Sequence, residues 1–330
     1  MKNSAIPLTK SASGVIIKKL GVLLRRLRGR LPDPLNLLVN TIVGKRSLNF
    51  FAPSYRMRGR LVVYRENIMI KKCLTIAGSD CSGGAGIQAD LKTFSAHGCY
   101  GASVITSVVA ENTSRVISVF NVPAEEIEKQ IDAVFEDIEI DAVKLGMLPT
   151  AEIIRAVAAK MRQYKPRCIV CDPVMVATSG DALSESGVCQ AFIDNMFPIA
   201  DLITPNIIEA ETFLGGYLEN VVNMKEAARI LHEYGAKAVL VKGGHLDGEP
   251  VDVLFDGKEY HELSARRIDS PNTHGTGCTL SSAIAANLAN GAEMKDAVRL
   301  AKDYVTNAIE KSYTVGKGHS PVHHFYKLWR

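Results

Sequence analysis

The chain has 330 residues, of which 47% are hydrophobic and 22% charged, a composition typical of a soluble protein with one large α/β domain. The net charge of +4 hides an asymmetry, because residues 1–72 hold sixteen Lys and Arg but two acids. The remainder has ten more acidic than basic residues, which excludes nucleic-acid binding as its main role. Seven scattered cysteines fit neither a disulfide framework nor a zinc pattern, which favours a reducing, cytoplasmic compartment.

Residues 1–68 differ from the rest of the chain. The segment from Val15 to Leu31 is basic and amphipathic, and the apolar stretch from Leu35 to Val43 is too short to span a bilayer. No secretory cleavage site follows. Three interpretations stay open: a non-native upstream extension, an organelle-targeting presequence, or a tail that contacts membrane or RNA. We favour the first, with residues 1–68 disordered or non-native, because Met69 leads directly into the first strand of a domain at 69–330.

From Cys73 onward, short apolar runs alternate with segments of helical spacing. Strands are expected at residues 73–77, 102–110, 142–146, 168–172, 201–204 and 238–242. Helices are expected at residues 87–97, 123–138, 151–164, 207–214, 224–234 and 278–289. This alternation predicts an α/β fold, with a mostly parallel central sheet, helices on both faces and a ligand at the carboxyl ends of the strands.

The expected strands end in residues with special side chains. They are Gly78-Ser-Asp80 with the loop 83–86, Glu111-Asn112, Gly146-Met147, Asp172-Pro-Val-Met175, Thr204-Pro-Asn206 followed by Glu209, and Lys242-Gly-Gly-His245. Singly, each is ordinary turn chemistry. On one edge of a sheet, however, Asp172, Glu209 and Lys242 fit a magnesium–nucleotide site, because Mg²⁺ binds one or two carboxylates together with phosphate oxygens.

The segment 272–282 is predicted to bind an anion. Gly275 and Gly277 flank Thr276, so the backbone can turn and expose its N–H groups ahead of a helix. Cys278 falls in the first turn of this helix, where a thiol ionises more readily. An anion site beside such a group indicates phosphoryl transfer. The alternative is an ordinary tight turn before a buried helix.

Two further motifs lead elsewhere. The run Gly84-Ala-Gly-Ile-Gln-Ala89 matches a dinucleotide-binding fingerprint, but its first glycine does not follow the expected strand directly. A Walker lysine loop is absent from the sequence, so the chain is not a P-loop enzyme. Cys168-Ile-Val-Cys171 lies within an expected buried strand and indicates core packing rather than a redox or metal site.

Long motifs together carry a resemblance to one enzyme family. They are the stretch 77–94, Lys144-Leu-Gly-Met147, Asp172-Pro-Val-Met175, Thr204-Pro-Asn206, Lys242-Gly-Gly-His245, the stretch 272–281 and the ending 318–325. These resemble the hydroxymethylpyrimidine/phosphomethylpyrimidine kinases of thiamine biosynthesis, which are ribokinase-like. The resemblance runs from about Ile70 to Phe325. It implies a three-layer α/β/α sandwich that uses ATP and Mg²⁺ to phosphorylate 4-amino-5-hydroxymethyl-2-methylpyrimidine, and then the resulting monophosphate.

The resemblance also implies roles for individual residues. Gly275, Thr276 and Gly277 become the anion hole for the transferred phosphoryl group, and Cys278 lies beside the acceptor oxygen, where most sugar kinases of the superfamily have aspartate. The other implied contacts are Asp172 and Glu209 with Mg²⁺, Lys242 and Thr276 with the nucleotide, and Asp80, Glu111, Met147 and Val174 with the pyrimidine. Small molecules are the expected partners, with no nucleic acid and no membrane, and a homodimer is compatible with the sequence.

Three positions carry further expectations. Glu111 stands where a member of the family has glutamine, and a carboxylate can accept from the 4-amino group but cannot donate to a ring nitrogen unless protonated. His274 is expected either to touch phosphate or to structure its loop, and His323 and His324 to pack at the C-terminus.

Two other functions remain open. Pyridoxal and pyridoxine are also flat heteroaromatic rings with a hydroxymethyl arm, so a pyridoxal-type kinase of the same superfamily is the alternative activity. A non-catalytic, ligand-sensing relative is the alternative of a different class, and the intact Cys278, Lys242 and glycine loop argue against it.

Overall fold

The structure is a computed structural model, and it describes residues 55–57, 60–62, 70–175, 187–244, 246 and 248–329. The chain divides into two compact units, Met1–Ile68 and Met69–Arg330. In the first unit, β1 (Tyr55–Met57) and β2 (Arg60–Val62) form an antiparallel pair. The expected disorder of the other residues in 1–68, and His245 of the glycine motif, lie outside the described residues. Every helix among the described residues is too short or too polar to cross a bilayer.

Nine strands of the second unit, counted within its described part, form one sheet in the order β11-β10-β9-β8-β7-β6-β3-β4-β5. They are β3 (Lys72–Asp80), β4 (Tyr100–Asn112), β5 (Arg115–Asn121), β6 (Ala142–Leu145), β7 (Ile169–Cys171), β8 (Leu202–Ile203), β9 (Val239–Val241), β10 (Val251–Phe255) and β11 (Tyr260–Ser264). The six strands from β9 to β4 run parallel, and antiparallel strands form both edges. The predicted mostly parallel sheet is confirmed.

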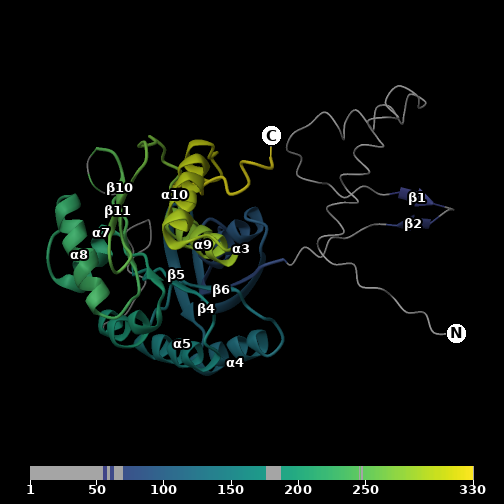
Figure 1. Ribbon diagram of the computed structural model, residues 1–330, viewed down its shortest axis with the longest axis horizontal. Coiled ribbons are helices and arrows are strands. Elements are labelled where there is room, and N and C mark those ends of the chain that lie inside the picture. The colour runs from purple at the N-terminus through teal and green to yellow at the C-terminus, as the bar shows by residue number, and fades with distance from the viewer. Residues whose placement is uncertain are drawn as a thin grey trace, which may run out of the picture. The chain divides into compact units, whose positions relative to one another are not determined.

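Helices cover both faces of this sheet, which gives three layers (Figure 1). One face carries α4 (Ala124–Phe135), α5 (Ala151–Tyr164), α6 (Val188–Ala191), η1 (Phe192–Met196), η2 (Phe197–Ile199), α7 (Ile207–Leu214) and α8 (Val221–Glu233). The other carries α3 (Gly86–Ala96), α9 (Thr276–Ala289) and α10 (Met294–Glu310). Each layer of helices buries a separate apolar cluster against the sheet, so the strands are apolar on both sides.

Local sequence explains where the helices behind the strand ends begin. The Ile153 N–H donates to the Thr150 hydroxyl at 3.1 Å, which caps α5. Asn206 and Glu209 form a capping box at the start of α7, and Gly215 in the left-handed region ends that helix. These caps hold the polar segments that follow β6 and β8 in fixed positions.

Several elements differ from the expectation. β3 continues beyond residue 77 to Asp80, because its last residues still pair with β4 after a register shift. β4 continues to Asn112 and turns back as β5, a hairpin that was not predicted. The antiparallel strands β10 and β11, the helix α10 and the short helical segment at residues 188–199 were also not predicted.

Candidate active site

A cavity of about 640 Å³ opens beside the carboxyl ends of the parallel strands. Every site residue that the sequence predicts lines it: Asp80, Glu111, Met147, Asp172, Val174, Glu209, Lys242, Gly275, Thr276, Gly277 and Cys278. These residues come from strand ends, helix starts and the segments between them, spread over most of the second unit, and the fold brings them together at one edge of the sheet.

The start of α9 forms one wall of the cavity. Gly275 is the N-cap residue, and its φ of 76° lies in the left-handed region. A Cβ at this position would lie 1.9 Å from the Gly84 carbonyl oxygen, so this close approach of two loops requires glycine. Among the described residues, α9 starts at the cavity without a side-chain cap, and its first N–H, that of Thr276, donates to the Thr273 carbonyl at 3.2 Å. A helix start of this kind suits an anion, because its first N–H groups have no partner within the helix.

Cys278 is the third residue of α9, so its predicted place in the first turn is confirmed. The backbone N–H of Gly86, the first residue of α3, also hydrogen-bonds to its sulfur. Two helix N-termini therefore converge on one thiol. Burial nevertheless raises the pKa of Cys278 to about 11, although the Lys144 ammonium and the Gly86 amide act in the opposite direction. The expectation of easy ionisation is wrong for the free protein, because desolvation outweighs the helix N-terminus.

Asp172, Glu209 and Lys242 form a charged group across the cavity. Lys242 Nζ lies 2.7 Å from Asp172 Oδ1 and 3.9 Å from Glu209 Oε2. Burial opposes the ionised form of Asp172, but Lys242 and Lys144 hold its pKa below the usual range. Burial raises the pKa of Glu209 to about 7, and Lys242 limits that rise. Asp172 is thus ionised at neutral pH, and Glu209 titrates near neutral pH.

The two carboxylates suit Mg²⁺ chemically, since both offer the hard oxygen ligands that this ion prefers. Thr204 and Ser281 donate to the Asp172 oxygens at 3.0 and 3.2 Å, which fixes the carboxylate in place. The Asn206 backbone N–H donates to Glu209 at 2.7 Å. Bound cationic charge near Glu209 would favour its ionised form, so the raised pKa is compatible with a metal site.

Asp80 organises the glycine loop between β3 and α3. Its carboxylate accepts hydrogen bonds from the backbone N–H groups of Ser82, Gly84 and Ala85 at 2.6, 2.9 and 2.7 Å. His274 Nε2 lies 2.9 Å from the same carboxylate. Asp80 lines the cavity, but these partners commit its oxygens to the loop. Of the two roles expected for His274, the structure places the ring where it structures its loop.

Met147 and Val174 give the cavity an apolar wall. The Thr106 hydroxyl donates to the Met147 carbonyl at 2.7 Å, and a Cβ at Gly78 would lie 3.1 Å from the Met147 sulfur. The thioether is therefore held directly over the end of β3. Glu111 lies at a register shift in β4, and one of its oxygens lies within 4.8 Å of Asp80 and His274. An apolar wall beside a few polar groups suits a flat heterocyclic ligand.

Comparison with known proteins places the chain in a family. Residues 80–323, well over half of its length, match the family described as phosphomethylpyrimidine kinase. The chain belongs to the phosphomethylpyrimidine kinase family. A hydroxymethylpyrimidine/phosphomethylpyrimidine kinase of Rhizobium meliloti is 50% identical over 261 residues, which cover 78% of this chain and 98% of that protein. The bifunctional thiamine biosynthesis protein ThiED of Geobacter sulfurreducens is 51% identical over 252 residues, 76% of this chain. This chain spans about half the length of that bifunctional relative (51%).

Solved structures of related kinases share the fold. A phosphomethylpyrimidine kinase from Clostridium difficile superposes with a TM-score of 0.65 at 47% identity, covering 72% of this chain and 99% of that one. A Bacillus subtilis pyridoxal kinase in an ADP complex superposes with a TM-score of 0.72 at 41% identity, covering 77% and 97%. The expected ribokinase-like sandwich is confirmed by this likeness.

Sequence reasoning missed three basic residues in or below the site of this phosphomethylpyrimidine kinase family member. Lys144 was quoted only as part of a motif, yet it is a fully buried lysine on β6 that pairs with Asp90. A lysine inside an apolar strand is the signal that could have identified it. Arg266 and Arg267, which follow β11, also line the cavity without having been predicted. His323 packs against the Tyr313 and Trp329 rings, as expected for C-terminal packing.

Proposed function

We propose that this protein transfers the γ-phosphoryl group of ATP to the hydroxymethyl oxygen of 4-amino-5-hydroxymethyl-2-methylpyrimidine, and then phosphorylates the monophosphate to the diphosphate. One observation carries the proposal: the Cys278 thiol and the N-terminus of α9 share a single cavity with Asp172, Glu209 and Lys242. The family and the names of the relatives support the same substrates. We also propose a cytoplasmic site of action, supported by seven cysteines that are all free.

The geometry suggests how the residues share the work. The N–H groups at the start of α9 would hold the transferred phosphoryl group, whose charge lies mainly on its equatorial oxygens in a loose transition state. The Lys242 ammonium would give up part of its contact with Asp172 and bind a phosphate oxygen instead, which offsets the negative charge of the phosphate. Mg²⁺, held by Asp172 and Glu209 directly or through water, would neutralise the phosphates of the nucleotide. Met147 and Val174 would orient the ring, so that its hydroxymethyl arm reaches the sulfur of Cys278.

The thiolate of Cys278 would accept the proton of the attacking hydroxyl as a general base. Its pKa of about 11 leaves the thiolate a minor species at pH 7 in the free protein. A loose transition state needs little proton transfer before the new bond forms. A weakly populated base that is well placed is therefore sufficient, and the sulfur also fixes the position of the acceptor oxygen.

The test is ADP release by the purified full chain, with hydroxymethylpyrimidine and with its monophosphate as acceptors. Turnover of both, and none without acceptor, is the expected result. A pyridoxal kinase is the second candidate, favoured by the likeness to solved pyridoxal kinases at 37–41% identity. Efficient turnover of pyridoxal without turnover of the pyrimidine would replace the first proposal by the second. Pyrimidine binding without ADP release would instead support the ligand-sensing alternative.

A further inference from the structure

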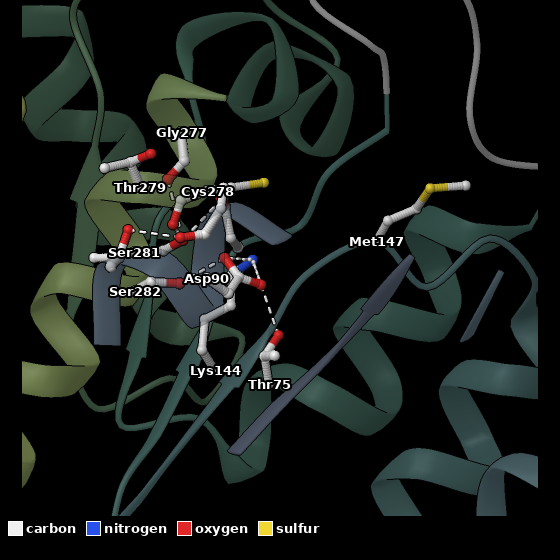
Figure 2. A network of polar contacts seen from close by, with 12 residues as sticks. Thr75, Asp90, Lys144, Met147, Gly277, Cys278, Thr279, Ser281 and Ser282 are labelled. Atoms are coloured by element: carbon white, nitrogen blue, oxygen red, sulfur yellow. Dashed lines mark hydrogen bonds and ion pairs between the residues drawn. The ribbon is translucent and has the colours of Figure 1, made fainter. Parts of the chain in front are cut away.

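A buried ion pair lies beneath the reacting end of the cavity. Asp90 on α3 and Lys144 on β6 have fully buried side chains, and Lys144 Nζ lies 3.0 and 2.9 Å from the two Asp90 oxygens. Figure 2 shows this pair below Cys278, between the strands and the start of α9, with the Cys278 sulfur pointing sideways in the direction of Met147. The proposed mechanism assigns neither residue a role.

The carboxylate of Asp90 on α3 is held by donors from three other elements. The Thr75 hydroxyl on β3 donates to Oδ2 at 2.6 Å, and the Ser282 hydroxyl on α9 donates to Oδ1 at 2.6 Å. With the two contacts from Lys144, both oxygens have two partners each. Lys144 is held closely as well, because a Cβ at Gly146 would lie 2.7 Å from its Nζ. The pair therefore cannot change its geometry without disturbing the sheet and both helices.

Stability alone does not account for this pair. Removing two charges from water costs several kcal/mol per ion, and apolar pairs of similar volume often stabilise a protein as well or better. The Asp90–Lys144 pair is distinguished by its neighbours in the active site. Lys144 interacts electrostatically with Cys278 and Asp172 as well as with Asp90. Burial opposes the charged lysine, but these acidic neighbours hold its pKa above the ordinary value.

We propose that Lys144, held in place by Asp90, is a positioning residue that fixes a positive charge beneath Cys278 and the start of α9. There it stabilises negative charge that develops on the sulfur and on the phosphoryl group. The catalytic meaning of this charge rests on the proposed function, whereas its effect on the sulfur does not.

The charged groups that face Cys278 come from several elements. Lys144 below it and Lys242 across the cavity favour the thiolate, and Asp90 and Asp172 oppose it. Of the two members of the ion pair, Lys144 has the larger effect on the pKa of Cys278. Removing both charges should therefore make the sulfur harder to ionise, and removing Asp90 alone should make it easier. Opposite shifts of this kind are the signature of a charge effect, because a loss of packing would move both variants in the same direction.

The experiment measures the rate of Cys278 alkylation by iodoacetamide between pH 7 and 9, where the rate is proportional to the small thiolate fraction, with the Cys278 peptide quantified by mass spectrometry and EDTA present. The variant Asp90→Asn/Lys144→Met removes both charges without leaving either partner unpaired. We expect its alkylation rate at each pH to fall by about tenfold, and the rate of Asp90→Asn to rise. The matched control is Asp132→Asn/Lys160→Met, which removes a different Lys–Asp pair that is partly buried and lies outside the cavity lining. Its profile should equal that of the wild type.

Steady-state kinetics provide the second readout. The double variant should lose at least about tenfold in kcat with little change in KM, because the charge acts mainly in the transition state. An unchanged alkylation rate in the folded double variant, or changes in the same direction for both variants, would overturn the proposal. If the double variant does not fold, the direction of the Asp90→Asn shift decides alone. Alkylation requires neither ATP nor pyrimidine, so a wild type without kinase activity would refute the proposed function and leave this test intact.

Discussion

Cys278 has two properties with opposite effects on its pKa: it lies at a helix N-terminus, which favours the thiolate, and it is buried, which opposes it. Replacing it by alanine should lower kcat on hydroxymethylpyrimidine by about 100-fold or more, the usual contribution of a general base. The rate of the wild type should rise with pH between 8 and 9.5, above the pKa of about 7 of Glu209, because the thiolate fraction of Cys278 grows below a pKa of about 11. That rise should be absent in Cys278→Ala. The control is Cys168→Ala, a half-buried cysteine outside the cavity lining. An alanine variant with the wild-type rate would remove the sulfur from the mechanism.

Asp80 provides a prediction about stability. Burial opposes its ionisation, but hydrogen bonds from His274, Ser82 and Ala85 hold its pKa well below the model-compound value of 3.8. A carboxylate with a depressed pKa stabilises the folded state above its unfolded pKa, and this contribution is lost as the pH falls below it. Asp80→Asn should therefore cost on the order of 2 kcal/mol at pH 7, and less at pH 3. Urea unfolding at both pH values measures the difference. An equal cost at both would show that the charge of Asp80 is not what holds the loop.

At the scale of elements, the junction of α3 and α9 depends on Gly275. Gly275→Ala should destabilise the fold by about 3 kcal/mol and abolish most activity, because the added methyl group would collide with the Gly84 carbonyl and displace the start of α9. Gly291, just beyond the other end of α9, is the matched control: its φ is also positive, at 93°, but an added Cβ meets nothing within 4 Å. Gly291→Ala should cost about 1 kcal/mol, from backbone strain alone, and leave kcat unchanged. Equal losses in both variants would contradict the role of close packing.

Which elements could be predicted follows from their surroundings. The parallel strands β6 to β9 and the helix α5 were found to within one residue at each end, because strands buried on both faces are short apolar runs and Thr150 marks a helix start. β5 was missed because it is an edge strand whose apolar residues, such as Ile117 and Phe120, are exposed, so no buried pattern marks it. β11 alternates exposed and half-buried residues with few strongly apolar positions, and it was missed for the same reason.

The predicted site lining came from the same logic, since residues after parallel strands must meet at one edge of the sheet. The pKa values and ion pairs of the site could not be predicted from the sequence by this logic. The raised pKa of Cys278 and the pairing of Lys144 with Asp90 depend on what packs around them in three dimensions. A sequence gives the charge of a side chain but not the amount of water that it loses on folding.

At the scale of the molecule, the described core residues of the second unit run from Cys73 to Val322, and the family match begins at residue 80. We therefore expect a protein that starts at Met69 to fold and to have the same kcat and KM as the full chain. Its thermal midpoint should agree within about 2 °C, since removing residues outside a core changes stability little. The truncation removes 14 of the 39 Lys and Arg residues but only two acids, so binding to anionic surfaces at low salt should weaken while kinase activity does not. A truncated protein that unfolds at a clearly lower temperature, or loses turnover, would show that residues 1–68 contribute to the kinase unit, and the assignment of one self-sufficient domain at 69–330 would have to be given up.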